Sequence, residues 1–144
     1  MKKVIQVTLI CCLLFFSNGC KQDIPQFDEY VFAVQLVNDS HKKREYLDYH
    51  KKVWPDVEKG FKKAGYHSIK LYIYDNYITM VVKVPKGTDL EQMGATKELN
   101  TDKVKDWNSL MSSYQKGLPG TTEGTTWVPM VKFYEFENNK SSND

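Results

Sequence analysis

The sequence has few cysteines, and all of them lie near its start. The chain of 144 residues contains three, Cys11, Cys12 and Cys20. No cysteine follows residue 20, which excludes an internal disulfide and any Cys-x-x-Cys motif from the rest of the chain. The longest apolar run, 4–16, includes two polar residues and is shorter than the ~20 apolar residues that a membrane-spanning helix needs.

Clustered basic charge and the common phosphate-binding motifs are also missing. The 20 Lys and Arg nearly balance the 18 Asp and Glu, and without Lys2 and Lys3 the counts are 18 and 18. A neutral domain without a basic block argues against a nucleic-acid partner. No glycine-rich phosphate loop, dinucleotide fingerprint or nucleophile elbow occurs. His41 and His50 are nine residues apart and no His-x-His occurs, so the sequence does not favour a metal site.

The start of the chain is typical of an export signal. Two lysines, an apolar stretch and a small polar stretch precede Cys20. Gly19-Cys20 resembles the bacterial lipoprotein signal, although Ser17 stands where a branched aliphatic residue is usual. We therefore expect a signal peptide at 1–19 and, at 20–29, a lipidated Cys20 with a tether, which would hold an exported protein on the periplasmic or outer-membrane side of a bacterial membrane. The alternative is an uncleaved anchor or a buried N-terminal helix.

The remaining sequence predicts one α+β domain at 30–136 and a polar tail at 137–144. The expected elements are a strand at 30–37, two helical pieces between 41 and 65 with a break near 51–54, strands at 68–74 and 77–84, helices at 89–95 and 102–115, and a strand at 127–136. Pro55 causes the break, and Asp75-Asn76 suits a tight hairpin turn. This order is the ferredoxin-like βαββαβ fold, with helices on one face of an antiparallel sheet.

The predicted strands carry more apolar side chains than one layer of helices covers. They include Phe32, Val34, Leu36, Tyr72, Tyr74, Val82 and Phe133. Pairing two such sheets around a two-fold axis would bury the second face. We therefore expect a homodimer of the dimeric α+β barrel type.

One histidine stands out as a candidate catalytic residue. Tyr46 and His50 are four residues apart on a predicted helix and share one face, just before Trp54-Pro55. A titratable imidazole beside a phenol suits proton transfer, whereas the alternative is a hydrogen-bonded structural histidine at a helix end. Aromatic rings commonly stack on the apolar faces of sugars, and the candidates for this are Trp54, Tyr72, Tyr74, Trp107 and Trp127.

The segment Glu45 to Val57, EYLDYHKKVWPDV, resembles the Tyr-x-x-x-His-x-x-x-Trp-Pro-Glu-Leu signature of L-rhamnose mutarotases. The similarity continues through Gly65, the strand at 69–75, Trp107 and the closing segment 131–134. It covers nearly all of residues 30–136.

The resemblance implies a homodimeric enzyme that interconverts the α and β anomers of L-rhamnose without cofactor or metal. His50 matches the family's proton donor, and Tyr46 matches a tyrosine that contacts the substrate. Trp107 matches the first residue of a Trp-Trp pair, but Asn108 replaces the second, and Ile69 stands where the family has a substrate-contacting tyrosine. These two departures leave the sugar open between deoxyhexoses such as L-rhamnose and L-fucose.

The reaction needs an acid for the ring oxygen and a base for the anomeric hydroxyl, and an imidazole near its usual pKa can exchange a proton at neutral pH. The sequence leaves the base open between Tyr46, Asp48 and a bound water. Two other functions stay open: a non-catalytic lipoprotein that binds a sugar or another small ligand, and a different enzyme on the same dimeric fold, such as a small monooxygenase or a haem-handling protein.

Overall fold

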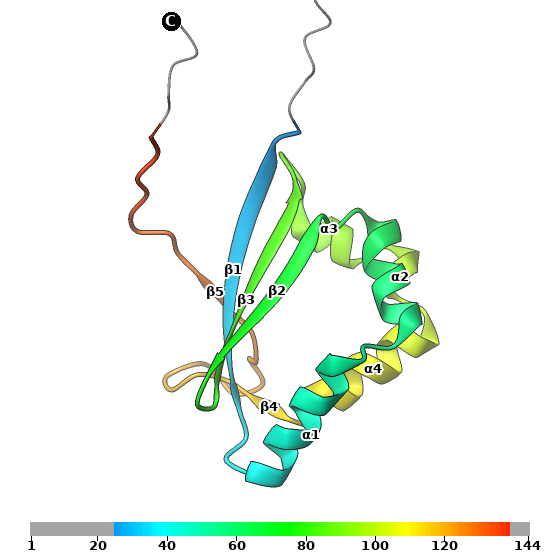
Figure 1. The fold of residues 1–144 in the computed structure, drawn as a ribbon, viewed down its shortest axis with the longest axis vertical. Coiled ribbons are helices and arrows are strands. Elements are labelled where there is room, and N and C mark those ends of the chain that lie inside the picture. The colour runs from blue at the N-terminus through cyan, green and yellow to red at the C-terminus, as the bar shows by residue number, and fades with distance from the viewer. Residues whose placement is uncertain (1–24, 139–144) are drawn as a thin grey trace, which may run out of the picture.

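The computed structural model describes residues 25–138 and places helices on one face of a curved antiparallel sheet (Figure 1). The strands are β1 (Phe27–Leu36), β2 (Ser68–Tyr74), β3 (Tyr77–Pro85), β4 (Gln115–Lys116) and β5 (Val128–Met130); the helices are α1 (Ser40–Lys51), α2 (Pro55–Ala64), α3 (Leu90–Gly94), the 3-10 turn η1 (Lys97–Leu99) and α4 (Asp102–Ser112). The strand order is β2-β3-β1-β4, with β5 also paired to β1. The ferredoxin-like α+β fold is therefore confirmed. The predicted signal peptide and Cys20 lie outside the described residues.

Local chemistry explains where α1 and α2 begin and end. The carboxylate of Asp39 accepts hydrogen bonds from the backbone N–H groups of His41 and Lys42, at 2.8 and 3.0 Å, and so caps α1. Pro55 occupies the first turn of α2, where a missing N–H costs nothing. Gly65 ends α2 with a φ of 100°, a conformation that favours glycine. The predicted helix break is confirmed.

Alternation along the strands separates a helix-facing side of the sheet from a far side. Val34 of β1 pairs with Ile78 of β3, and both side chains are buried on the helix-facing side. In the predicted turn between β2 and β3, Asp75 has a positive φ of 48°. Tyr72 and Tyr74 lie on the far side, where Tyr74 is 85% exposed.

No helix among residues 25–138 is long and apolar enough to cross a membrane.

The structure corrects three predicted boundaries. β1 starts at Phe27, so residues 27–29 belong to the sheet and not to the tether. Helix α4, predicted at 102–115, ends at Ser112, and the two-residue strand β4 follows it. The last strand covers only Val128–Met130 of the predicted 127–136. Beyond it, residues 131–136 form an extended arm that leaves the sheet, and Phe133 in this arm is 97% exposed (Figure 1).

Candidate active site

A cavity of about 1180 Å³ lies between the helix-facing side of the sheet and the helices. Residues of β1, β2 and β3 line one side of it, and residues of α1, α2 and α4 line the other. The five residues at positions that the family resemblance marks as catalytic or substrate-contacting all line it: Tyr46 and His50 from α1, Ile69 from β2, and Trp107 and Asn108 from α4. Segments far apart in the sequence thus meet in one place.

The helix holds His50 in a defined orientation. Its Nδ1 lies 2.8 Å from the backbone carbonyl oxygen of Tyr46, one turn earlier in α1. Because a carbonyl can only accept, Nδ1 carries the proton in the neutral ring and Nε2 keeps its lone pair. The His50 and Tyr46 rings also pack against each other, with centroids 4.3 Å apart. The site therefore contains an oriented imidazole with one free basic nitrogen.

Burial sets the protonation states of the His50 imidazole and the Tyr46 phenol. It lowers the pKa of His50 below its ordinary value of 6.5, and the hydrogen bond to the Tyr46 carbonyl opposes this effect only in part. Burial also raises the pKa of the Tyr46 phenol, which is 2% exposed. At neutral pH the pair is thus an unprotonated imidazole, which accepts a proton, beside a protonated phenol, which can donate one.

The Tyr46 hydroxyl has a partner that the sequence analysis missed. The side-chain amide of Gln115 donates to Tyr46 Oη across 3.4 Å, and Gln115 also lines the cavity. Gln115 is in place because β4 pairs with β1 at Leu36. A strand of two residues leaves no periodic signal in the sequence, so tertiary pairing alone positions this group.

Trp107 forms the aromatic wall of the site. Its ring stands edge-on to His50, with centroids 5.5 Å apart, and to Trp54, at 5.4 Å. Of the other stacking candidates, Trp127 lines the cavity, whereas Trp54 supports Trp107 from behind and lines a separate surface hollow. Tyr72 and Tyr74 do not reach the cavity, because their strand turns them to the far side. Two of the five predicted stacking residues therefore line the cavity.

The floor of the cavity is apolar. Ile69 pairs with Val82 on the helix-facing side of the sheet, and Phe32, Leu71 and Met80 line the cavity beside them. Ile69 can only pack against a ligand, whereas Asn108 adds an amide that both donates and accepts. The walls are thus polar near α1 and α4 and apolar along the strands.

One of the candidate bases is excluded by position. Asp48 does not line the cavity, and its carboxylate lies 2.6 Å from the ammonium of Lys51 on the exposed face of α1. Of the predicted bases, Tyr46 and a bound water remain. His50, predicted as the proton donor, is neutral at neutral pH with Nε2 unprotonated, so it joins them as a candidate base. Among residues 25–138, no three His, Cys, Asp or Glu side chains come together in a way that would hold a metal ion.

Known proteins resemble this chain both in sequence and in structure, and two relatives in sequence come first. A UPF0734 protein of Dictyostelium discoideum is 26% identical over 118 residues, 80% of this chain and 94% of that protein. An L-fucose mutarotase of Xanthomonas campestris is 25% identical over 99 residues, 67% of this chain and 78% of that protein.

Two solved structures share the fold. The L-rhamnose mutarotase of Formosa agariphila has a TM-score of 0.54 at 20% identity, covering 76% of this chain and 99% of that one. Tetracenomycin F2 cyclase of Streptomyces glaucescens, at 9% identity, has a TM-score of 0.56 and covers 76% and 97%. A model of the L-rhamnose mutarotase family matches residues 29–136, nearly the whole described domain. The chain therefore belongs to the L-rhamnose mutarotase family.

Proposed function

We propose that this protein interconverts the α and β anomers of a deoxyhexose such as L-rhamnose or L-fucose. The observation that carries the proposal is the His50 ring, which lines the cavity and is tied through Nδ1 to the α1 backbone, so that Nε2 is its free basic nitrogen. Tyr46 and Trp107 lie against the same ring. Ring opening of a pyranose requires an acid and a base, and an aromatic wall can hold the sugar ring beside them.

The proposed reaction is a proton exchange at the anomeric carbon. His50 Nε2 takes the proton of the anomeric hydroxyl, the bond from the anomeric carbon to the ring oxygen breaks, and the ring oxygen takes up a proton. Tyr46, with its raised pKa, can supply that proton or hold the ring oxygen while His50 returns its own. Reclosure on the other face of the aldehyde reverses each transfer, so the protein and the sugar end with their protons balanced.

The apolar floor favours a deoxyhexose. The carbon beyond the ring is a methyl group in these sugars and a hydroxymethyl group in ordinary hexoses. A methyl group packs well against Ile69, Leu71 and Met80, whereas a hydroxyl placed there would lose its hydrogen bonds. Discrimination by a buried, unpaired hydroxyl is worth ~1–3 kcal/mol.

Anomer exchange measured by saturation-transfer NMR tests the function. The purified full chain should accelerate exchange of L-rhamnose or L-fucose over the buffer rate, and accelerate glucose less. No acceleration on any deoxyhexose would leave the family fold intact and favour the non-catalytic binding lipoprotein. That alternative is suggested by Ile69 and Asn108, which replace substrate-contacting residues of the family.

The exchange rate should depend on pH through His50. Because burial places its pKa below 6.5, the active neutral form dominates at neutral pH. The rate constant should therefore be flat near neutrality and fall about tenfold per pH unit once the pH is below the folded-state pKa. Unfolded His50 takes up its proton at a higher pH than folded His50, so stability also falls as the pH drops below 6.5. An NMR titration of the imidazole gives the pKa directly, and a rate that is flat through that pKa contradicts the assignment.

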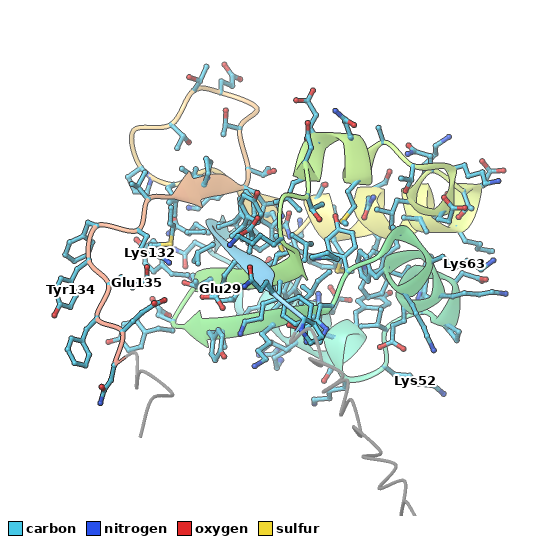
Figure 2. All side chains as sticks on the ribbon, turned by 90° about the horizontal axis from the view of Figure 1, so that it is seen from above. Glu29, Lys52, Lys63, Lys132, Tyr134 and Glu135 are labelled. Atoms are coloured by element: carbon cyan, nitrogen blue, oxygen red, sulfur yellow. The ribbon has the colours of Figure 1, made fainter. Side chains whose placement is uncertain are left out.

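We further propose that two copies pair through the far side of the sheet and the arm at 131–136. The far side presents Tyr72, Tyr74 and Met130, each more than half exposed, and the arm continues directly from Met130. Figure 2 shows Tyr134 and Glu135 on this arm, well away from the helix that carries Lys63. Exposed apolar side chains of this kind are typical of a protein interface, and a second copy offers the same surface in return.

Deleting the arm should dissociate this dimer. Phe133 and Phe136 are 97% and 76% exposed in the single chain, and burying one such ring in an interface gains ~1.5–3 kcal/mol. A chain ending at Met130 should therefore dimerise at least about 100-fold more weakly in sedimentation equilibrium. A chain ending at Phe136, which keeps the arm, is the matched control. Equal dissociation constants for the two truncated chains would remove the arm from the interface.

We also propose that the protein is exported and lipid-anchored through Cys20, which would place it where sugars are released from glycans outside the cell. The supporting features are the signal-like stretch at 1–19 and Gly19-Cys20. Mass spectrometry of the membrane fraction should find an acylated cysteine at the N-terminus. An unprocessed chain in the soluble fraction would contradict the proposal.

A further inference from the structure

The cavity extends far beyond the pair Tyr46 and His50. Gln115 marks one end, close to the β2-β3 turn, because Leu36 pairs with it and also donates its N–H to the carbonyl of Asn76 in that turn. Ser68, at the start of β2, marks the other end and lies six residues from Tyr74 at the turn. At ~3.3 Å per strand residue, the two ends are about 20 Å apart.

This size exceeds what one sugar ring needs. Pockets that bury a whole drug-sized ligand measure roughly 300–1,000 Å³, and the cavity measures about 1180 Å³. A single pyranose bound beside His50 and Trp107 would leave the end near Ser68 unfilled. Gln115 and Ser68 line the same cavity, so its two ends are continuous.

The end near Ser68 has the polar groups that bind sugar hydroxyls. Glu58 and Lys62, one helical turn apart on α2, line it together with His67 and Ser68. A carboxylate accepts, an ammonium donates and an imidazole can do both. Ser68 shares the strand face of Tyr72 and Tyr74, so its hydroxyl is not counted among these groups. The His67 ring is held in place, because it stacks on Phe27 with centroids 3.9 Å apart and its backbone N–H donates to the Lys83 carbonyl at 2.9 Å.

We propose that Glu58, Lys62 and His67 form a second sugar subsite, so that the substrate is a short oligosaccharide with the deoxyhexose at its reducing end. This proposal rests on the proposed function. Mutarotation needs a free anomeric hydroxyl, so the reducing-end ring lies at His50 and the next ring extends along the cavity toward α2. The glycosidic bond between the rings stays intact, and only the hemiacetal of the reducing end opens and recloses.

The test compares two sugars with the same full chain. Exchange is measured on L-rhamnose and on a disaccharide that carries L-rhamnose at its reducing end, or on the L-fucose pair if that sugar is preferred. The second-order rate constant for the disaccharide should exceed that for the monosaccharide by about 3- to 10-fold, the effect of one or two additional hydrogen bonds. Lys62→Ala should remove most of this difference and leave the monosaccharide rate unchanged.

Lys63→Ala is the matched control, because Lys63 is the next residue of α2, does not line the cavity and extends away from the sheet (Figure 2). It should leave both rate constants unchanged. A disaccharide rate equal to or below the monosaccharide rate overturns the proposal, as does a Lys62→Ala loss that is the same for both sugars.

A failure of the proposed function gives a different result. If neither sugar is accelerated, the dissociation constants of the two sugars, measured by calorimetry, still decide the second subsite. Tighter binding of the disaccharide that Lys62→Ala weakens and Lys63→Ala does not supports the subsite. Equal binding of the two sugars overturns it.

Discussion

Replacing His50 with alanine is expected to abolish most of the acceleration of anomer exchange, by about 10²- to 10⁴-fold, the usual contribution of a positioned acid or base. The expectation follows from the tautomer. Nδ1 is occupied by the Tyr46 carbonyl, so Nε2 is the nitrogen available to the sugar, and burial keeps it unprotonated by lowering the pKa of His50. Saturation-transfer NMR at neutral pH gives the rate constant.

Two companion variants separate chemistry from folding. His50→Gln keeps a polar side chain but cannot exchange a proton near neutral pH, so it should be as slow as His50→Ala while unfolding at nearly the parent temperature. His41→Ala, the same substitution at an exposed position at the start of α1, should change neither property. Full activity in His50→Gln would assign His50 the structural role that was the alternative in the sequence.

Most of the fold follows from local sequence signals. Asp39, Pro55 and Gly65 each act on their own backbone or on that of their neighbours, so the ends of α1 and α2 could be predicted without tertiary information. The same holds for the turn at Asp75. The spacing of Tyr46 and His50 likewise decides that they share a helix face, because four residues make about one helical turn.

Features that depend on distant segments could not be predicted. The aromatic and β-branched residues of 131–136 fit a strand, but a strand also needs a partner, and within the described chain β1 pairs with β5 only as far as Met130. Gln115 enters the site because the two residues of β4, Gln115 and Lys116, pair with the C-terminal end of β1. Asp48 is one of the three bases that the sequence leaves open, yet it lies on the exposed face of α1 beside Lys51. In each case the missing information is which surfaces meet in three dimensions.

The second large effect concerns Tyr46, whose ring and hydroxyl should have separate roles. The ring belongs to the buried core and packs edge-on against Tyr114, with centroids 6.1 Å apart. Tyr46→Ala should therefore lower the free energy of unfolding by ~3–5 kcal/mol, a large part of the ~5–15 kcal/mol that holds a typical domain folded. Thermal or urea unfolding measures this loss. A loss below about 1 kcal/mol would mean that neighbouring core side chains repack into the space left by the Tyr46 ring.

Tyr46→Phe keeps the ring and removes only the hydroxyl that Gln115 contacts. If this hydroxyl supplies a proton or a hydrogen bond to the ring oxygen, exchange should slow by roughly 10- to 100-fold, as expected for a hydrogen bond to a developing charge, with little change in stability. Tyr114→Phe makes the same change in the same core cluster but outside the cavity, so it should leave the rate unaltered. An unchanged rate in Tyr46→Phe would mean that His50 alone carries the proton from the anomeric hydroxyl to the ring oxygen. Both oxygens are bonded to the anomeric carbon, so one imidazole nitrogen can serve each in turn, and Tyr46 would then matter only for positioning the ring of His50.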